Sequence, residues 1–146
     1  EITTRLVGSE MCKETALFES AKINTPKLLP YYFDDIFSVL QNVSDLSEFS
    51  KNQLYPLYVL TNSEKLFGAA VILYPNLLSS IAKKMNHDLI IIPSSLHEVL
   101  LLPAEQGESS EEYSSIIQEV NLSELSPEEI LSDHAYYYSR KTDSIC

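Results

Sequence analysis

Two short runs of apolar residues, Leu89–Ile92 and Val99–Leu102, lie near each other in the chain and flank a polar segment, residues 93–98. Apolar runs of this kind are buried in folded proteins, so this part of the chain is predicted to form the middle of the core. Leu89–Ile92 is predicted to be a β-strand that Pro93 ends. Val99–Leu102 is predicted to be a second strand, with a helix as the open alternative, because periodicity cannot decide between the two in so short a run.

Two further apolar runs upstream predict a β-hairpin. Tyr55–Thr61 and Leu66–Tyr74 have the composition of strands, and the Asn-Ser-Glu-Lys sequence between them is typical of a turn. The small residues Gly68–Ala70 indicate that another segment packs closely over the second of these strands. Apolar positions at spacings of three and four residues then predict a helix from Asn76 to Met85.

The N-terminal part is predicted to hold two helices. Ser9 is a suitable N-cap for a helix that continues to Asn24 and that Pro26 brings to an end. A second, short helix is predicted over Phe33–Leu40, because its apolar residues follow a helical spacing. The polar residues 41–53 are predicted to form a loop.

The C-terminal part is predicted to contain two helices and a strand. A serine followed three residues later by glutamate is the pattern of a capping box, and it occurs at Ser109 and Glu112 and again at Ser126 and Glu129. Each pair predicts the start of a helix. The aromatic residues of Ala135–Ser139 favour a strand.

These elements predict an α+β fold. The strands gather in the middle of the chain and are joined mostly by short turns, whereas a doubly wound fold alternates strands with helices. We therefore predict a largely antiparallel central sheet of about five strands, with helices packed on it and two helices at the N-terminus. A length of 146 residues predicts a single domain over residues 1–146.

The charge is strongly acidic and unevenly distributed. The net charge is −11, and residues 104–133 contain nine acidic residues and no Lys or Arg. Such a surface repels phosphate groups, so we expect neither nucleic-acid binding nor adhesion to anionic membranes. The acidic stretch is interpreted as a solvated helix face, with a docking face for a basic partner as the functional alternative.

Two cysteines, Cys12 and Cys146, stand near opposite ends of the chain. They do not make a disulfide framework, and a reducing cytoplasm is the expected location. Neither lies in a metal-binding motif, and a glycine-rich phosphate loop is absent from the sequence, so no cofactor is expected.

Ser94, Ser95, His97 and Glu98 are the sharpest candidates for chemistry. A hydrolase uses a serine as nucleophile, a histidine as base and a carboxylate to orient it. However, residues this close in sequence rarely converge as a triad. The favoured interpretation is structural: Ser95 and Glu98 form a capping box around one helical turn over residues 95–98, and His97 hydrogen-bonds locally.

The other histidines occur beside aspartates, in His87-Asp88 and Asp133-His134. With His97 they offer ligand types that zinc accepts, but the fold would have to bring three separate segments together. We therefore predict no metal site, and interpret His87 as a helix-end residue and His134 as the residue that opens the last strand.

The run Tyr136-Tyr137-Tyr138 is a candidate binding surface, because tyrosine joins an apolar ring to a polar hydroxyl. In a strand, Tyr136 and Tyr138 share one face and Tyr137 takes the other. One face is expected to belong to the core, and the other is a candidate interface.

Four stretches resemble a bacterial family of uncharacterised proteins, a domain of unknown function. They are Leu17–Thr25, Gly68–Pro75, Ile92–Val99 and Leu131–Tyr138, and the most specific is the Pro-Ser-Ser-x-His-Glu string within the third. The resemblance implies a bacterial origin, a cytoplasmic location and a further N-terminal region, so that this chain would be the C-terminal part of a longer protein. It implies no activity.

The functional hypothesis is a non-enzymatic, cytoplasmic protein-interaction or regulatory module, with a protein partner or a homo-oligomer. The alternative is a hydrolase or metal-dependent enzyme that uses the Ser94, Ser95, His97 and Glu98 cluster.

Overall fold

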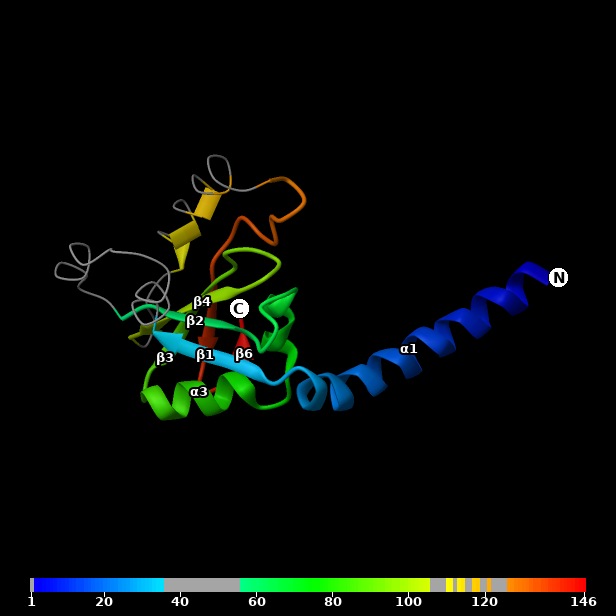
Figure 1. Cartoon of the computed structure of the whole chain (residues 1–146), viewed down its shortest axis with the longest axis horizontal. Helices are drawn as coiled ribbons and strands as arrows, with labels where there is room; N and C mark the ends of the chain where they lie inside the picture. The colour runs from blue at the N-terminus through cyan, green and yellow to red at the C-terminus, as the bar shows by residue number, and fades with distance from the viewer. Residues whose placement is uncertain are drawn as a thin grey trace.

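The computed structural model describes residues 2–35 (residues 2–12 as backbone), 56–105, 110, 111, 113, 114, 117, 118, 121 and 126–146. Its centre is one sheet of six strands in the order β1-β2-β4-β3-β5-β6, with every neighbouring pair antiparallel (Figure 1). The strands are β1 (Tyr31–Asp35), β2 (Tyr58–Asn62), β3 (Asp88–Ile92), β4 (Val99–Ala104), β5 (Tyr136–Ser139) and β6 (Ser144–Ile145). The predicted α+β class is confirmed.

The two apolar runs form the central strands of this sheet. Ile90 pairs with Leu102 and Ile91 with Leu101, so each apolar residue of β3 lies beside one of β4. A strand that is covered on both faces is apolar at successive positions, which explains the lack of alternation in these runs. The strand predicted at Val99–Leu102 is confirmed, and the helical alternative is excluded.

Helices cover the sheet on both faces. The 3-10 helix η2 (Gly68–Leu73) and the helix α3 (Leu77–Met85) pack on one face, and the described helical residues between 111 and 121 lie on the other (Figure 1). The first core contains Leu60, Leu78, Ile81, Leu89, Ile91, Val99, Leu101 and Tyr138, and the second contains Ile90, Leu102, Ala104, Ile117 and Ala135. The helix predicted to end at Met85 is confirmed.

The N-terminal helix is longer than predicted. Helix α1 (Ile2–Leu28) runs through Pro26 and projects away from the sheet (Figure 1). A proline in the last turn removes one backbone hydrogen bond but does not end the helix at that point. Leu29 N–H still donates to Thr25 O at 2.8 Å. The prediction that the helix ends before Pro26 is therefore wrong.

A second N-terminal helix was predicted over Phe33–Leu40. This prediction is wrong for residues 33–35, which belong to β1. Pairing with β2 places Phe33 beside Leu60, and the Phe33 ring stacks on Tyr58 with ring centroids 5.1 Å apart. This long-range pairing overrides the helical spacing of the apolar residues. Residues 36–40 of that prediction, and the loop predicted at 41–53, lie outside the described residues.

The predicted hairpin is also wrong. The strand at Tyr55–Thr61 exists as β2, but Leu66–Tyr74 folds into η2 rather than into its partner strand. Phe67 has a φ of 50°, which breaks an extended conformation just before η2 begins. The predicted close approach at Gly68 is confirmed, because a Cβ atom there would lie 2.5 Å from His97 O and 2.7 Å from Asn62 N.

Two hydrogen bonds hold the junction between α1 and β1 to the rest of the fold. The Tyr74 hydroxyl donates to Leu29 O at 2.7 Å, and Ser63 N–H donates to Pro30 O at 2.8 Å. The last turn of α1 is thereby fixed to the segments that precede and follow η2.

At the C-terminal end, the strand predicted at Ala135–Ser139 is confirmed as β5. The helix predicted after Ser126 is wrong, because residues 127–129 form a single turn. Ser126 Oγ does donate to Glu129 Oε2 at 2.7 Å, but Glu129 O accepts a hydrogen bond from Leu96 N–H at 3.0 Å instead of continuing a helix. Ser109 and Glu112 lie outside the described residues.

Candidate functional site

The serine and histidine segment between β3 and β4 is bound to its surroundings mainly through backbone groups. Ser95 N–H donates to Glu98 O at 3.2 Å, and His97 N–H donates to Ser95 Oγ at 3.0 Å. These contacts close a bend between the two strands. The helical turn predicted over residues 95–98 is therefore wrong. Ser95 does accept a hydrogen bond from a backbone N–H, as a capping residue does, and the donor is His97, two residues further along the chain.

His97 anchors η2 to the sheet. Its Nδ1 accepts a hydrogen bond from Phe67 N–H at 3.1 Å, its carbonyl oxygen accepts one from Thr61 Oγ1 at 2.6 Å, and its ring lies 5.4 Å from the Phe67 ring between centroids. An Nδ1 that accepts requires the proton of a neutral ring to sit on Nε2. The imidazole thus stabilises the left-handed backbone conformation of Phe67, the residue before Gly68.

These contacts bear on the hydrolase hypothesis. A triad needs a serine hydroxyl hydrogen-bonded to the imidazole and a carboxylate on its other nitrogen. In the part of the chain that the structure describes, Ser95 Oγ contacts the backbone of His97 and the ring contacts Phe67. Ser94 and Glu98 are half-buried. The geometry of this segment supports a structural role.

The remaining histidines lie in separate environments. His87 Nδ1 is 3.9 Å from Glu105 Oε1, and His134 contacts Asp133, its neighbour in the chain. Among the described residues, no group of three His, Cys, Asp or Glu side chains is placed to hold a metal ion.

The three consecutive tyrosines have different environments. Tyr138 is buried in the core under α3, and its hydroxyl donates to Asp143. Tyr137 packs against the opposite core. Tyr136 is 39% exposed and its hydroxyl is 3.0 Å from Ser132 Oγ. Of the run proposed as a binding surface, Tyr136 has the greatest exposure.

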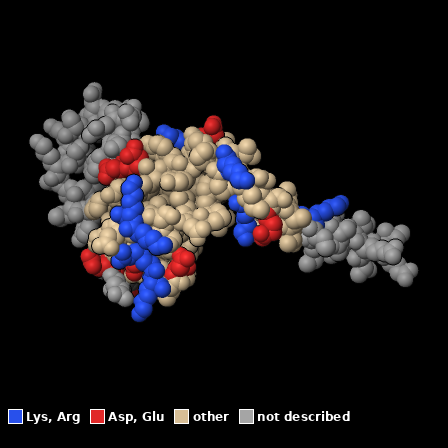
Figure 2. All heavy atoms as spheres, turned by 90° about the horizontal axis from the view of Figure 1, so that it is seen from below, with Lys and Arg blue, Asp and Glu red and all other residues tan. Residues whose placement is uncertain are grey.

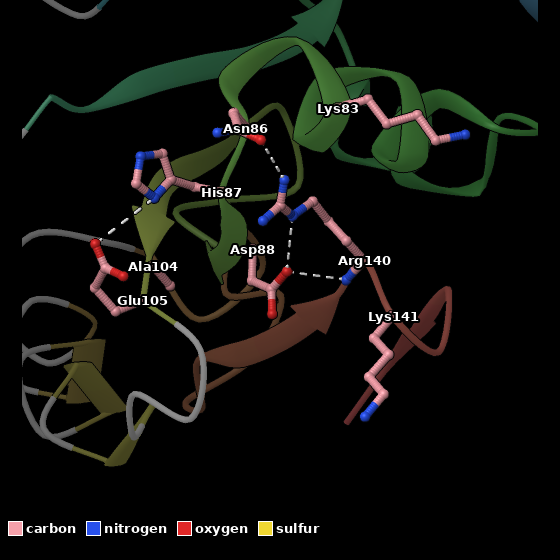
Figure 3. Close-up of a pocket in the computed structure, with 8 residues that line it drawn as sticks. All are labelled: Lys83, Asn86, His87, Asp88, Ala104, Glu105, Arg140 and Lys141. Atoms are coloured by element: carbon pink, nitrogen blue, oxygen red, sulfur yellow. Dashed lines mark hydrogen bonds and ion pairs between the residues drawn. The ribbon is translucent and has the colours of Figure 1, made fainter.

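A hollow of about 650 Å³ opens where α3 ends and β3 begins, beside the end of β5 (Figure 3). It is lined by Lys83, Asn86, His87, Asp88, Ala104, Glu105, Arg140 and Lys141. Asn86 ends α3 with a φ of 60°, a conformation that asparagine tolerates well, so the chain turns directly into β3. Pairing of β3 with β5 then brings Arg140 beside Asp88.

Asp88 is the centre of the polar contacts in this hollow, although it is only 6% exposed. Its Oδ1 accepts hydrogen bonds from Arg140 N and Arg140 Nε, both at 3.1 Å, and its Oδ2 accepts one from the Tyr137 hydroxyl at 2.6 Å. The Tyr137 hydrogen bond, with those of the Arg140 backbone and side chain, holds the pKa of the Asp88 carboxyl below its ordinary value. Asp88 therefore stays ionised and keeps the Arg140 side chain in place.

The wall of the hollow is rich in cations. Arg140 Nη1 donates to Asn86 Oδ1 at 3.0 Å, and the side chains of Lys83 and Lys141 extend from the two flanking elements (Figure 3). Seen from the side of α3, Lys and Arg side chains form a row with Asp and Glu at its edges (Figure 2). Within the described residues, Lys83 and Lys141 have no ion-pair partner.

Besides the hollow, helix α1 is a feature that the packing of the sheet does not explain. Every described side chain from Lys13 to Asn24 is exposed, including those of Leu17, Phe18 and Ile23. Leu28, in the last turn, is 77% exposed. Lys22 pairs with Glu19 at 3.3 Å and lies over the Phe18 ring, so these contacts stay within the helix.

The sequence predicted His87 at a helix end with Asp88 beside it, but no local pattern connected Asp88 with Arg140. Asp88 and Arg140 are 52 positions apart in the sequence, and the β3–β5 pairing that brings them together cannot be read from a local pattern. An aspartate at the start of an apolar run was the one available signal, because a buried carboxylate requires partners.

Comparison with known proteins places the chain in a protein family. A family model described as "family of unknown function (DUF5688)" matches residues 2–140. Neither the curated proteins nor the solved structures gave a match. In the described residues, none of the helices combines the length and apolar character needed to cross a membrane.

Proposed function

The chain belongs to the family of unknown function DUF5688, and we propose that it acts as a non-enzymatic protein-interaction module whose interaction element is α1. The observation that carries this proposal is the exposure of the helix. Leu17 is 71% exposed and Leu28 is 77% exposed, in a helix of 27 residues that projects from the sheet. Isolated helices are marginally stable in water, and most helices in proteins are stabilised by packing of an apolar face.

The partner that we propose for α1 is a second copy of this chain. Leu17, Ala21 and Leu28 follow one another at spacings of four and seven residues, so they lie along one side of the helix. Two copies of one helix can bury the same side chains against each other, which is the usual arrangement of a symmetric dimer. At about 1.5 Å per residue the helix is about 40 Å long, which gives the two copies an extended seam.

The chemistry of the other candidate residues supports a module without catalysis. Ser95 Oγ binds the backbone of the bend, and His97 joins η2 to the sheet through Phe67 N–H and the Thr61 hydroxyl. The proposal includes a cytoplasmic location, which is supported by the presence of only two cysteines. It also includes the position of this domain as the C-terminal part of a longer protein.

Sedimentation velocity over a range of concentrations tests the proposal. We expect a dimer that persists at high salt, because apolar contacts are not screened by ions. Replacement of Leu17 and Leu28 by lysine should give a monomer. The matched control is the double variant Leu66→Lys, Leu73→Lys, since these leucines are also exposed, at 55% and 61%, but lie in or beside η2. A chain that is monomeric at every concentration contradicts the proposal.

Circular dichroism supplies an independent reading of the same proposal. If α1 is stabilised by a second copy, dilution should lower the helical signal, because an unpaired helix frays. A helical signal that is independent of concentration, in a monomer, would show that α1 needs no second copy.

A further inference from the structure

The cationic hollow between α3 and β5 lies on the folded body, and its chemistry is independent of α1. The chain has 21 acidic and 10 basic residues, so a surface on which cations gather stands out against the charge of the chain as a whole. Lys83 and Lys141 nevertheless line one hollow without an ion-pair partner among the residues that the structure describes. Unpaired cations grouped in this way attract anions.

Arg140 is held in a fixed orientation at the centre of this wall. Two of its nitrogen atoms, the backbone N and Nε, donate to the buried Asp88 carboxylate, and Nη1 donates to Asn86 Oδ1. The Nη2 group is the part of the guanidinium that these three bonds leave available. Because Arg140 is paired with Asp88, Lys83 and Lys141 are the cations of the described lining without an ion pair, and Glu105, 3.9 Å from His87, is the remaining acid.

We propose that this hollow binds an acidic peptide segment of a partner protein, with its carboxylates on Lys83, Lys141 and the Nη2 group of Arg140. Asn86 and His87 add neutral polar groups to the wall. Binding pockets for ligands typically span about 300–1,000 Å³, and a hollow of about 650 Å³ has room for more than one side chain of a peptide.

The surroundings favour a peptide over a polyanion. Asp88 and Glu105 line the same hollow, and the net charge of the chain is −11. A nucleic acid carries a phosphate at every nucleotide of a long backbone, so the acidic surface of the chain repels it over its whole length. A short acidic peptide carries fewer charges, on flexible side chains, so it meets less of this repulsion when its carboxylates contact the lysines.

Fluorescence anisotropy with a labelled hexaglutamate peptide and the full chain tests this inference. We expect binding at low ionic strength that weakens as salt is added. Substitution of both Lys83 and Lys141 by alanine should weaken the affinity about tenfold. The matched control, Lys27→Ala with Lys65→Ala, removes the same charge from two exposed positions away from the hollow and should leave the affinity unchanged.

Three outcomes would overturn the inference. The first is no binding of the peptide at low salt. The second is equal loss of affinity in the hollow variant and in the control, which would indicate attraction by overall charge. The third is displacement of the peptide by an equal concentration of inorganic phosphate, which would indicate a site for a small anion. The Leu17→Lys, Leu28→Lys variant should bind the peptide like the parent chain, so this result is separate from that for α1.

Discussion

Asp88 Oδ1 accepts two hydrogen bonds from Arg140, one from its backbone N and one from its side-chain Nε, each 3.1 Å long. One carboxylate therefore fixes both the path of the chain after β5 and the direction of the arginine side chain. Asp88 is placed at the first position of β3, so the contact joins the beginning of one strand to the end of its neighbour.

The Asp88–Arg140 contact is expected to be important for stability. Asp88→Ala removes the acceptor of three hydrogen bonds and leaves Arg140 and Tyr137 without a charged partner. We expect a loss of about 2 kcal/mol in the free energy of unfolding, the range for hydrogen bonds to a charged group. Urea denaturation measures it. Asp133→Ala is the control, because the Asp133 side chain is 59% exposed, and a similar loss in both variants would contradict the argument.

Stability should also depend on pH through Asp88. The hydrogen bond from Tyr137, followed by those from Arg140, lowers the pKa of Asp88 in the folded chain below its ordinary value of 3.8. A lowered folded-state pKa stabilises the fold above the unfolded pKa, and this contribution is lost as the pH falls through the folded pKa. We expect the free energy of unfolding to decrease below about pH 4.

Asp88→Asn provides the comparison for this pH dependence. The amide does not ionise, so the decrease on acidification should be shallower in the variant than in the parent chain. Urea titrations of both proteins between neutral pH and about pH 3 measure the difference. Equal slopes would show that Asp88 does not contribute.

Gly68 is expected to tolerate no side chain. The Cβ of an alanine would lie 2.5 Å from His97 O and 2.7 Å from Asn62 N, and both are backbone atoms that cannot rotate away. Gly68→Ala should destabilise the fold by about 3 kcal/mol, at the upper end for overpacking. Thermal unfolding of this variant beside Ala70→Ser, at an exposed neighbour, measures the effect. A Gly68→Ala midpoint equal to that of the parent would refute the close approach.

His97 is expected to act as a hydrogen-bond acceptor in the fold. His97→Ala leaves Phe67 N–H without its partner and should cost about 1 kcal/mol. His97→Asn should recover part of this loss, because an asparagine Oδ1 can occupy the position of the histidine Nδ1. Thermal unfolding midpoints of the two variants give the comparison. Unchanged midpoints in both would return this segment to consideration as a reactive site.

Ser95 gives a separate prediction in the same segment. Its Oγ accepts the hydrogen bond of His97 N–H at 3.0 Å, so Ser95→Ala should lower the free energy of unfolding by about 1 kcal/mol. Ser94→Ala is the natural control, since Ser94 is half-buried and precedes the bend. Chemical denaturation of both variants measures the difference, and an equal effect would show that the capping bond is not what stabilises the bend.

The parts of the fold that were predictable are those with strong local patterns. Leu89–Ile92 and Val99–Leu102 are continuous apolar runs, and the helix that ends at Met85 has a clear apolar face, so each formed as expected. The aromatic run of β5 was equally clear. In each of these segments the local preference and the tertiary environment agree.

The wrong predictions are those in which a distant contact decides the structure. Phe33 was assigned to a helix by spacing, but pairing with β2 makes it part of a strand. Leu66–Tyr74 was assigned to a strand by composition, but contact of Gly68 with the backbone of His97 and Asn62 belongs to a tight helical turn. The hollow was missed for the same reason, since it depends on strand order.

The junction at Leu29 and Pro30 has a mechanical consequence for α1. Hydrogen bonds from Tyr74 and Ser63 hold the two carbonyl groups where the helix ends, and β1 begins at the next residue. A flexible hinge would let the helix swing without disturbing the sheet. Here two hydrogen bonds hold the end of the helix in place. A force applied to the far end of α1 is therefore transmitted to β1 and, through strand pairing, to β2.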